Sequence, residues 1–465
     1  MEPTAEHEGA MLQWMVHEGC RVHPNLKIRR GNDGLRSVFI DCDVTSETEL
    51  FAVPLTAVLS PETATDLDKT VTKSLEELDW NATPLLLMME LSKGKDSRWW
   101  PYLRLLPKSL DTPLFWKESE LEELIGTYIY DEIGKDTIKD TFVQQIQPFM
   151  NAHPQYFTEE HGSVDAFLYA GSIVMAYAFF NEGVHAMVPL ADLLNHRTGR
   201  NNARIFAEDG FLVMRAIVDI ACGSELINTY GDYGNGELVR RYGFYDEDNV
   251  WSMVEFSRPL VMECCRKVRE AEKEKEASPW KPLSKSDERE RKKLLRSLSC
   301  WRDNYVVCRQ ALHFPTSLLI LVRLWSVETG QVKDTFKLIR QWHDRMAARR
   351  KEGKHDDDDN NHNDKEDGEE SDSEDDSDID SWGTVMALPP LTDPVVQQRQ
   401  QAILALLIEA RNALYPSIYP SLGSDEARWR SKDAQQLSIP QRLALRVRLD
   451  ERQILEKLRI SLSSL

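Results

Sequence analysis

Short runs of mainly apolar residues, bounded by polar residues, predict β-strands in the first part of the chain. Residues 37–40 and 50–54 follow this pattern, and residues 31–34 before them are typical of a turn. The strand pattern returns in three later runs, residues 204–206, 211–217 and 225–230. These runs predict a β framework whose parts are far apart in the sequence.

Elsewhere apolar residues recur at every third or fourth position, which predicts amphipathic helices. In the first half the helical pattern covers residues 61–170, with clear segments at 85–91, 114–125 and 163–179. In the second half it covers residues 301–345, 401–411 and 443–462. We therefore expect a β framework that a helical insert interrupts, followed by a part that is mainly α-helical.

The chain of 465 residues is too long for one ordinary core, so we expect two domains. Its hydrophobic fraction of 41% is sufficient for soluble cores. The sequence has no apolar run of about eighteen residues, and residues 1–8 lack a basic region followed by an apolar stretch. We therefore expect a soluble protein of the nucleus, the cytoplasm or both, with no membrane partner.

Acidic residues are concentrated in one stretch of the second half. Residues 355–380 contain fifteen Asp and Glu against one Lys, so they supply −14 of the formal net charge of −20 and the rest carries −6. Because this stretch has almost no apolar residues, burial cannot offset its ordering entropy, and we expect a disordered loop. Such a loop is either a solvated insertion or a tail that attracts a basic partner. The mildly acidic remainder is compatible with a basic protein partner, and we expect no direct nucleic-acid binding.

Seven cysteines are scattered through the chain without a Cys-x-x-Cys pair. This spacing indicates reduced, mostly buried thiols rather than a structural zinc site. The sequence has no Ser-His-Asp or metal-ligand constellation, and its glycines do not follow the spacing of a dinucleotide-binding loop. We therefore expect neither a metal site nor a nicotinamide cofactor.

Two segments about thirty residues apart carry the candidate chemistry. Residues 187–196 form an apolar run that ends in Asn195 and His196, and residues 225–231 form a strand-like run that contains Tyr230. Taken singly, an Asn-His pair is more often a satisfied turn, and a strand tyrosine is more often half-buried packing. Their order and spacing, with the Arg-Tyr-Gly-Phe sequence at residues 241–244, indicate one joint site.

These segments resemble SET-domain protein lysine methyltransferases of the Rubisco large-subunit methyltransferase type, in particular a subgroup that includes a fungal ribosomal protein lysine methyltransferase. The resemblance lies in residues 31–35, 97–103, 112–116, 174–179, 188–196, 228–231, 242–244 and 443–455. It implies an α+β fold, a split SET fold of small β-sheets with a helical insert, followed by an all-α substrate-binding domain. No cysteine cluster follows residue 244, unlike in many histone-directed SET enzymes.

The resemblance also implies domain boundaries. Residues 1–60 are the N-terminal part of the SET domain, 61–170 the helical insert and 171–250 its C-terminal catalytic part. Residues 251–345 and 385–465 form the helical substrate-binding domain, and residues 346–384 form the acidic disordered loop.

Site residues follow from the same resemblance, which implies S-adenosylmethionine as the cofactor. Tyr230 matches the catalytic tyrosine, whose hydroxyl orients the lysine amine and stabilises the polarised methyl group. Since the ordinary tyrosine pKa is about 10, we assign it positioning before base catalysis. The cofactor-binding positions are Asp33, Gly34, Leu35, Tyr177, Asn195, His196 and Tyr242. At Tyr177 more distant relatives have an arginine, which is suited to the methionine carboxylate.

Trp99, Phe180 and Asp192 are the expected substrate-side residues. Core packing is the alternative for Trp99 and Phe180, and a structural cap is the alternative for Asp192. The function implied is methylation of a lysine on a non-histone protein, with a ribosomal large-subunit protein as the expected substrate and a monomeric enzyme. A different function remains open, a non-catalytic SET scaffold that binds a basic protein partner.

Overall fold

The computed structural model of the chain describes residues 4–30, 36–65, 67–181, 184–273, 283–357, 388–431 and 436–463. The chain divides into two compact units. Unit 1 comprises Met1–Leu121, Asp131–Asn249 and Ser438–Leu443, and unit 2 comprises Glu122–Tyr130, Val250–Leu437 and Ala444–Leu465. Part of the segment that the sequence assigns to the helical insert, Glu122–Tyr130, is therefore grouped with unit 2.

Unit 1 contains several small β-sheets. The strands are β1 (Arg21–Val22), β2 (Leu26–Arg30), β3 (Arg36–Ile40), β4 (Glu49–Pro54), β5 (Ala178–Asn181), β6 (Val184–Met187), β7 (Asn195–His196), β8 (Ala203–Glu208), β9 (Phe211–Ala216), β10 (Ser224–Glu225) and β11 (Ile227–Asn228). They pair in the orders β1-β4-β9-β8, β10-β3-β2, β5-β6 and β11-β7. The β11-β7 pair is parallel, whereas the others are antiparallel.

The strand pattern in the sequence follows from burial. In β4 the four central residues are all buried, because the strand lies between β1 and β9 in the middle of its sheet. In β8, an edge strand of the same sheet, only Ala203 is buried. The predicted strands at residues 37–40, 50–54, 204–206 and 211–217 are confirmed as β3, β4, β8 and β9.

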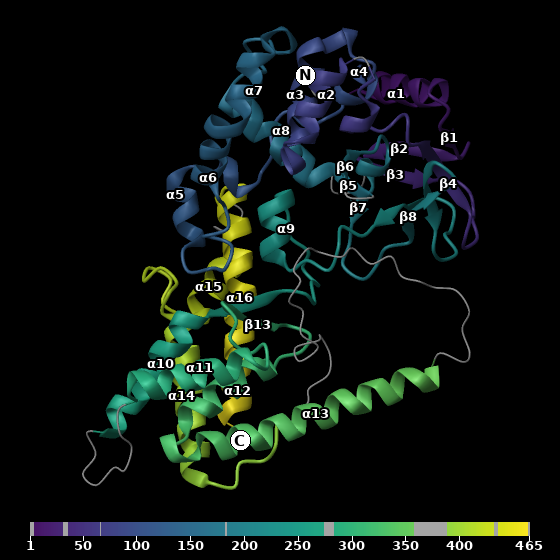
Figure 1. Ribbon diagram of the computed structural model, residues 1–465. Coiled ribbons are helices and arrows are strands. Elements are labelled where there is room, and N and C mark those ends of the chain that lie inside the picture. The colour runs from purple at the N-terminus through teal and green to yellow at the C-terminus, as the bar shows by residue number, and fades with distance from the viewer. Residues whose placement is uncertain are drawn as a thin grey trace. The chain divides into compact units, whose positions relative to one another are not determined.

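Nine α-helices of the described residues accompany these sheets. They are α1 (Ala5–His17), α2 (Lys69–Glu76), α3 (Ala82–Lys93), α4 (Trp100–Leu103), α5 (Glu118–Leu121), α6 (Lys135–Thr141), α7 (Gln147–Ala152), α8 (Val164–Tyr177) and α9 (Asn235–Tyr242). Figure 1 shows the small sheets on one side of unit 1 and α7 on the other, with α8 between them. Helix α3 buries nine consecutive residues, so it forms the centre of the apolar core.

Unit 2 is helical apart from one two-stranded sheet. Its elements are β12 (Met253–Ser257), α10 (Arg258–Lys273), α11 (Lys285–Arg296), β13 (Asn304–Cys308), α12 (Thr316–Ser326), α13 (Val332–Asp357), α14 (Pro394–Asn412), α15 (Leu422–Arg430) and most of α16 (Ile439–Ser463). Strands β12 and β13 pair along their full length, from Met253 with Cys308 to Ser257 with Asn304. A separate apolar core joins α10, α12, α14 and α16.

Three expectations about elements need correction. The helical pattern at residues 301–345 includes strand β13, because Tyr305 and Val307 pack alternately into the core of unit 2. The segment 114–125 is broken into the short helix α5 and two 3-10 turns rather than one helix. Helix α13 continues through residues 346–357, which the sequence assigns to the acidic loop, since alanine, arginine and lysine there favour a helix (Figure 1). Residues 358–384 lie outside the described residues.

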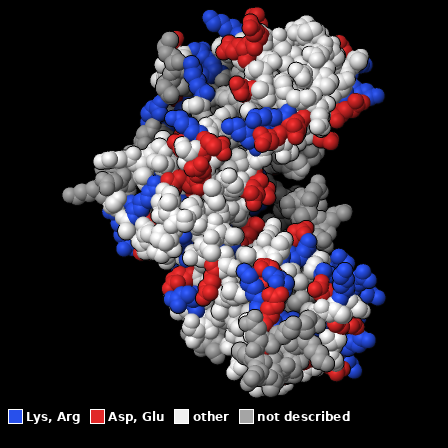
Figure 2. Space-filling model, turned by 90° about the vertical axis from the view of Figure 1, so that its left-hand side faces the viewer, with Lys and Arg blue, Asp and Glu red and all other residues white. Residues whose placement is uncertain are grey.

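Positively and negatively charged side chains are interspersed on the surface. In unit 2, for example, Arg266 pairs with both Glu263 and Glu270 along one face of α10. Figure 2 shows Lys and Arg side chains beside Asp and Glu side chains over the visible face. Among the described residues, no helix combines the length and the apolar character needed to cross a bilayer.

Candidate active site

The two segments singled out in the sequence meet in the parallel pair of β7 and β11. Asn195 lies opposite Ile227, and His196 lies opposite Asn228. His196 Nδ1 accepts a hydrogen bond of 3.1 Å from the backbone N–H of Tyr230. Burial lowers the pKa of His196, so the ring is neutral and its proton lies on Nε2. The imidazole of His196 therefore holds the backbone at Tyr230 in place.

An aromatic cluster surrounds this junction. The ring of Tyr230 lies 4.7 Å from Tyr242, 5.2 Å from His196 and 6.2 Å from Phe244, measured between centroids. Tyr242 and Phe244 are 6.1 Å apart. We name Tyr230, Tyr242, Phe244 and His196 the aromatic cluster. Its electron-rich ring faces favour a cation placed against them.

Gly243 makes this cluster possible. It ends α9 with a φ of +76°, a left-handed conformation that lets Tyr242 and Phe244 on either side both approach Tyr230. A Cβ atom at this position would lie 2.9 Å from the backbone carbonyl carbon of Asp111. Glycine is thus required at position 243 both by the left-handed backbone conformation and by the close approach of the backbone at Asp111.

The Tyr230 hydroxyl has a fixed direction. It donates a hydrogen bond of 2.9 Å to the backbone carbonyl of Leu194. Burial, with smaller contributions from Tyr177 and Tyr242, raises the pKa of Tyr230 far above its ordinary value. The hydroxyl therefore stays protonated and acts as a neutral hydrogen-bonding group rather than as a base.

Asn195 is held through its side chain. Its Nδ2 donates hydrogen bonds of 2.8 Å to Ser37 Oγ of β3 and of 2.8 Å to Glu225 Oε1 of β10. These bonds join β7 to the β10-β3-β2 sheet and use both hydrogens of the amide. The backbone of residues 195 and 196 is therefore presented in a defined orientation.

Asp192 is a buried carboxyl group in the 3-10 turn Ala191–Leu193. Its Oδ2 accepts a bond of 2.7 Å from the Tyr102 hydroxyl, whereas its Oδ1 is buried without a hydrogen-bond partner. Burial raises the pKa of Asp192 to about 7, against the opposing effect of the Tyr102 bond. Burial, and to a smaller extent the negative charge of Asp192, raises the pKa of the half-buried Tyr177 to about 12.

The Asp192→Asn variant should therefore show a pH-dependent gain in stability. An unfolded aspartate has a pKa of about 3.9, so the wild-type protein loses stability as the pH rises from there to about 7, where the carboxyl ionises while folded. Asparagine cannot ionise and still accepts the Tyr102 bond. We expect the variant to be more stable by roughly 4 kcal/mol at pH 8 and by little at pH 4. Denaturant unfolding between these pH values measures the difference, and a difference independent of pH would contradict it.

The remaining substrate-side positions differ sharply in exposure. Trp99 is 2% exposed and donates its indole N–H to the Ala57 carbonyl at 3.0 Å, which is a core position. Phe180 is 48% exposed on β5, and its ring lies 5.2 Å from His185. The side chain of Phe180 is thus available on the surface, whereas that of Trp99 is not. Asp33, Gly34 and Leu35 lie outside the described residues.

The structure brings together Tyr230, Asn195, His196 and Tyr242, and adds residues that the sequence analysis did not assign. Phe244 completes the aromatic cluster, Ser37 and Glu225 hold Asn195, and Tyr102 holds Asp192. Phe244 follows Tyr242 in the same motif, so its position was detectable. The other contacts join segments up to 158 residues apart. Among the described residues, no group of three or more His, Cys, Asp or Glu side chains is arranged to hold a metal ion.

Taken together, these residues can bind a cation beside a neutral tyrosine hydroxyl. The aromatic faces and the open Asp192 oxygen favour positive charge, and the hydroxyl, whose proton is donated to the Leu194 carbonyl, presents its oxygen as a hydrogen-bond acceptor of fixed direction.

Sequence comparison finds relatives over part of the chain. The chain is 31% identical over 261 residues to the rat protein "N-lysine methyltransferase SETD6", covering 52% of the chain and 55% of the relative. It is 26% identical over 283 residues to the yeast protein "Ribosomal lysine N-methyltransferase 4", covering 54% and 57%. The chain thus spans about half the length of the curated relatives it matches. No protein-family model matches it.

Structural comparison covers nearly the whole chain. The SET domain of LSMT bound to lysine and AdoHcy matches with a TM-score of 0.66 over 99% of this chain and 92% of that chain, at 15% identity. Rubisco LSMT bound to AdoMet matches with a TM-score of 0.64 over 100% of this chain and 92% of that chain, also at 15% identity. At this identity the match establishes the fold.

Proposed function

We propose that this chain, which has the SET-domain fold of the Rubisco large-subunit methyltransferase type, is an S-adenosylmethionine-dependent protein lysine N-methyltransferase. The observation that carries the proposal is the aromatic cluster around Tyr230, whose hydroxyl is fixed on the Leu194 carbonyl. Lysine methyltransferases with partial sequence similarity support it.

The residues present fit S-adenosylmethionine, whose sulfonium supplies an electrophilic methyl group when it is bound. Tyr242 and Phe244 offer ring faces to a cation, and the backbone of Asn195 and His196 is held in one orientation. Tyr177, at the end of α8, is the candidate partner for the methionine end, with a hydroxyl that stays protonated. The unpartnered Oδ1 of Asp192 favours positive charge nearby.

Methyl transfer is an in-line displacement, so the residues must present a neutral lysine amine to the methyl group. The C–N bond forms as the C–S bond breaks, the sulfur keeps the electron pair, and the amine has given its proton to water beforehand. Apolar surroundings and an adjacent cation lower a lysine pKa and favour this loss. Tyr230 positions the amine and polarises the site by its hydroxyl dipole.

The proposed substrate is a lysine of a non-histone protein, and specifically of a large ribosomal subunit protein. The name of the yeast relative supports a ribosomal substrate. The mild net charge outside the acidic stretch is compatible with a basic partner.

The test is methylation, with tritiated S-adenosylmethionine, of large ribosomal subunits and separately of the remaining proteins from cells that lack this protein. We expect tritium in one ribosomal protein, recovered as methyllysine after acid hydrolysis, and calorimetric binding of the cofactor. Label only in other proteins would remove the ribosomal substrate and keep the activity. Absence of both label and cofactor binding would favour the non-catalytic module.

A further inference from the structure

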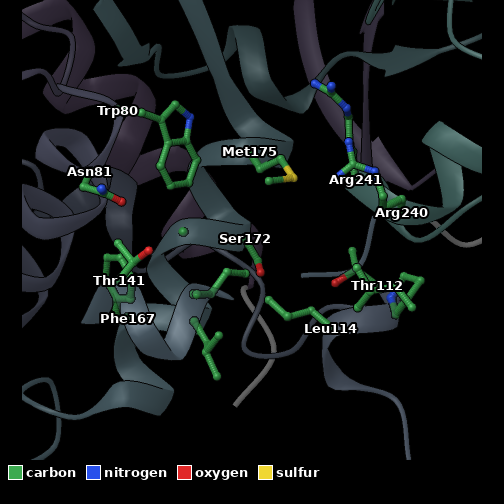
Figure 3. Close-up of a pocket in the computed structure, with 15 residues that line it drawn as sticks. Trp80, Asn81, Thr112, Leu114, Thr141, Phe167, Ser172, Met175, Arg240 and Arg241 are labelled. Atoms are coloured by element: carbon green, nitrogen blue, oxygen red, sulfur yellow. The ribbon is translucent and has the colours of Figure 1, made fainter. Parts of the chain in front are cut away.

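A cavity of about 270 Å³ lies in unit 1 beside α8 and α9. Its walls are largely apolar and include Phe167, Leu168 and Met175 of α8. Figure 3 shows Trp80 on one side of the cavity and Arg240 and Arg241 on the opposite side, with Met175 between them. Because an apolar cavity of about 150 Å³ already holds a benzene ring, this one has room for a large apolar side chain.

The two arginines form a fixed wall rather than a free basic patch. Arg240 and Arg241 both donate to the carboxylate of Glu237, at distances between 2.7 and 2.9 Å. Arg241 also lies 4.8 Å from the centroid of the Tyr233 ring. The cavity therefore keeps its shape on this side, and apolar contact is the main interaction that it offers.

A second hollow, of about 380 Å³, adjoins the first at Trp80, which lines both. It is acidic, with Glu62, Glu76 and Asp79 in its wall. None of these three carboxylates has an ion-pair partner in the part of the chain that the structure describes. Unpaired carboxylates in a concave surface favour a lysine or arginine side chain.

Aromatic side chains line this second hollow, and one of them lies close in sequence to a candidate site residue. Phe180 and His185 also line it, and His185 lies 5.2 Å from Phe180 and 6.4 Å from Trp80. Phe180 follows Tyr177 by three residues. Phe180 and Trp80 are 48% and 37% exposed, which is unusual for two neighbouring large aromatic side chains.

The first cavity is also lined by residues that are close in sequence to the candidate active site. Met175 and Arg241 line it, and each is within two residues of a candidate site residue, Tyr177 on α8 and Tyr242 on α9. With a rise of 1.5 Å per helical residue, these lining residues lie within about 3 Å of the site residues along each helix axis. An extended peptide advances by roughly that distance per residue, so side chains close to the target lysine in the peptide are the ones expected in the cavity.

We propose that the two hollows joined at Trp80 form a docking track for the polypeptide segment that carries the target lysine. The apolar cavity takes a large aliphatic or aromatic side chain of that segment, and the acidic hollow takes an arginine or lysine side chain. This proposal rests on the proposed function for the identity of the segment. The acidic charge of the second hollow and its continuity with Phe180 identify the occupant as a basic, partly apolar peptide.

The test uses the full chain, immobilised, and a synthetic library of nine-residue peptides with a central lysine and no other lysine. Peptides that bind are sequenced, and the same peptides are then offered as substrates with labelled S-adenosylmethionine. We expect wild-type protein to enrich one large apolar residue by roughly tenfold and arginine by about threefold, at positions near the lysine. Binding and methylation are thus read separately.

Two variants test the two halves of the track. Ser172→Leu fills the apolar cavity from α8 (Figure 3) and should remove the apolar preference only, whereas Ser172→Ala should keep it. The triple variant Glu62→Gln, Glu76→Gln, Asp79→Asn should remove the arginine preference. Its matched control removes three exposed carboxylates elsewhere in unit 1, by the changes Glu118→Gln, Glu159→Gln and Glu160→Gln.

Each outcome decides one of the two proposals. Preferences that respond to the variants, without methyl transfer, would uphold the two hollows as a peptide-docking track and overturn the proposed activity. Methyl transfer with preferences that survive Ser172→Leu and the triple variant, or with no retained peptide, would overturn the track and leave the activity in place.

Discussion

Replacing Tyr230 by phenylalanine should lower the rate of methyl transfer by about 10²–10³-fold while leaving cofactor binding nearly unchanged. The hydroxyl is the only group lost, and the ring stays between His196 and Tyr242. Loss of the bond to the Leu194 carbonyl should cost about 1 kcal/mol of stability, too little to unfold the chain. Initial rates with labelled cofactor and calorimetric cofactor affinity give the two readouts.

Tyr169→Phe is a matched control for this variant. Its hydroxyl donates a comparable bond of 2.8 Å to the Pro107 carbonyl, in the same unit and outside the aromatic cluster. We expect its loss to affect stability by a similar amount and the rate by less than about twofold. If Tyr230→Phe kept full activity, or if Tyr169→Phe lost as much, the hydroxyl of Tyr230 would have no special role.

The high pKa of Tyr230 determines how a loss of rate in the Tyr230→Phe variant is interpreted. Burial keeps the hydroxyl protonated, so the lost rate reflects a missing hydrogen-bonding dipole rather than a missing base. The pH profile of the wild-type enzyme should accordingly show no titration of Tyr230 between pH 7 and about 10. An activity loss in this range that Tyr230→Phe abolished would contradict this assignment.

The longer elements could be predicted from the sequence because each is an apolar run that is long enough to recognise and lies buried in the core. Strands β3 and β4 and helices α3 and α8 all appear where the pattern places them. Strand β13 was not predicted from the sequence, because its five residues are adjacent in the sequence to helical segments of similar apolar content. Helix α13 extends past its predicted end because helix-favouring residues continue there without an apolar pattern.

The site itself was only partly predictable. Strands β7 and β11 are two residues long, and their parallel pairing leaves no periodic signal. The contacts of Asn195 with Ser37 and Glu225, and of Asp192 with Tyr102, depend on the tertiary fold. Periodicity also could not distinguish Trp99 in the core from Phe180 on the surface, because exposure is set by elements distant in sequence.

A buried charge network in unit 2 gives the largest expected effect on stability. Asp425 of α15 is fully buried and accepts bonds of 2.9 to 3.1 Å from Arg448 and a further bond from Arg452, both on α16. Arg448 also donates a bond of 2.7 Å to the Glu123 backbone carbonyl. The network joins three chain segments that are far apart in the sequence.

Asp425→Ala should therefore lower the free energy of unfolding by about 3–5 kcal/mol, because two buried guanidinium groups lose their shared carboxylate. Glu426→Ala, at the next residue of α15, provides the control, since Glu426 pairs at 3.5 Å with an arginine whose side chain is 75% exposed. We expect that change to cost less than about 1 kcal/mol. Denaturant unfolding of the full chain measures both variants. Equal losses would mean that the buried network contributes no more than a surface pair, and that apolar packing alone holds α15 against α16.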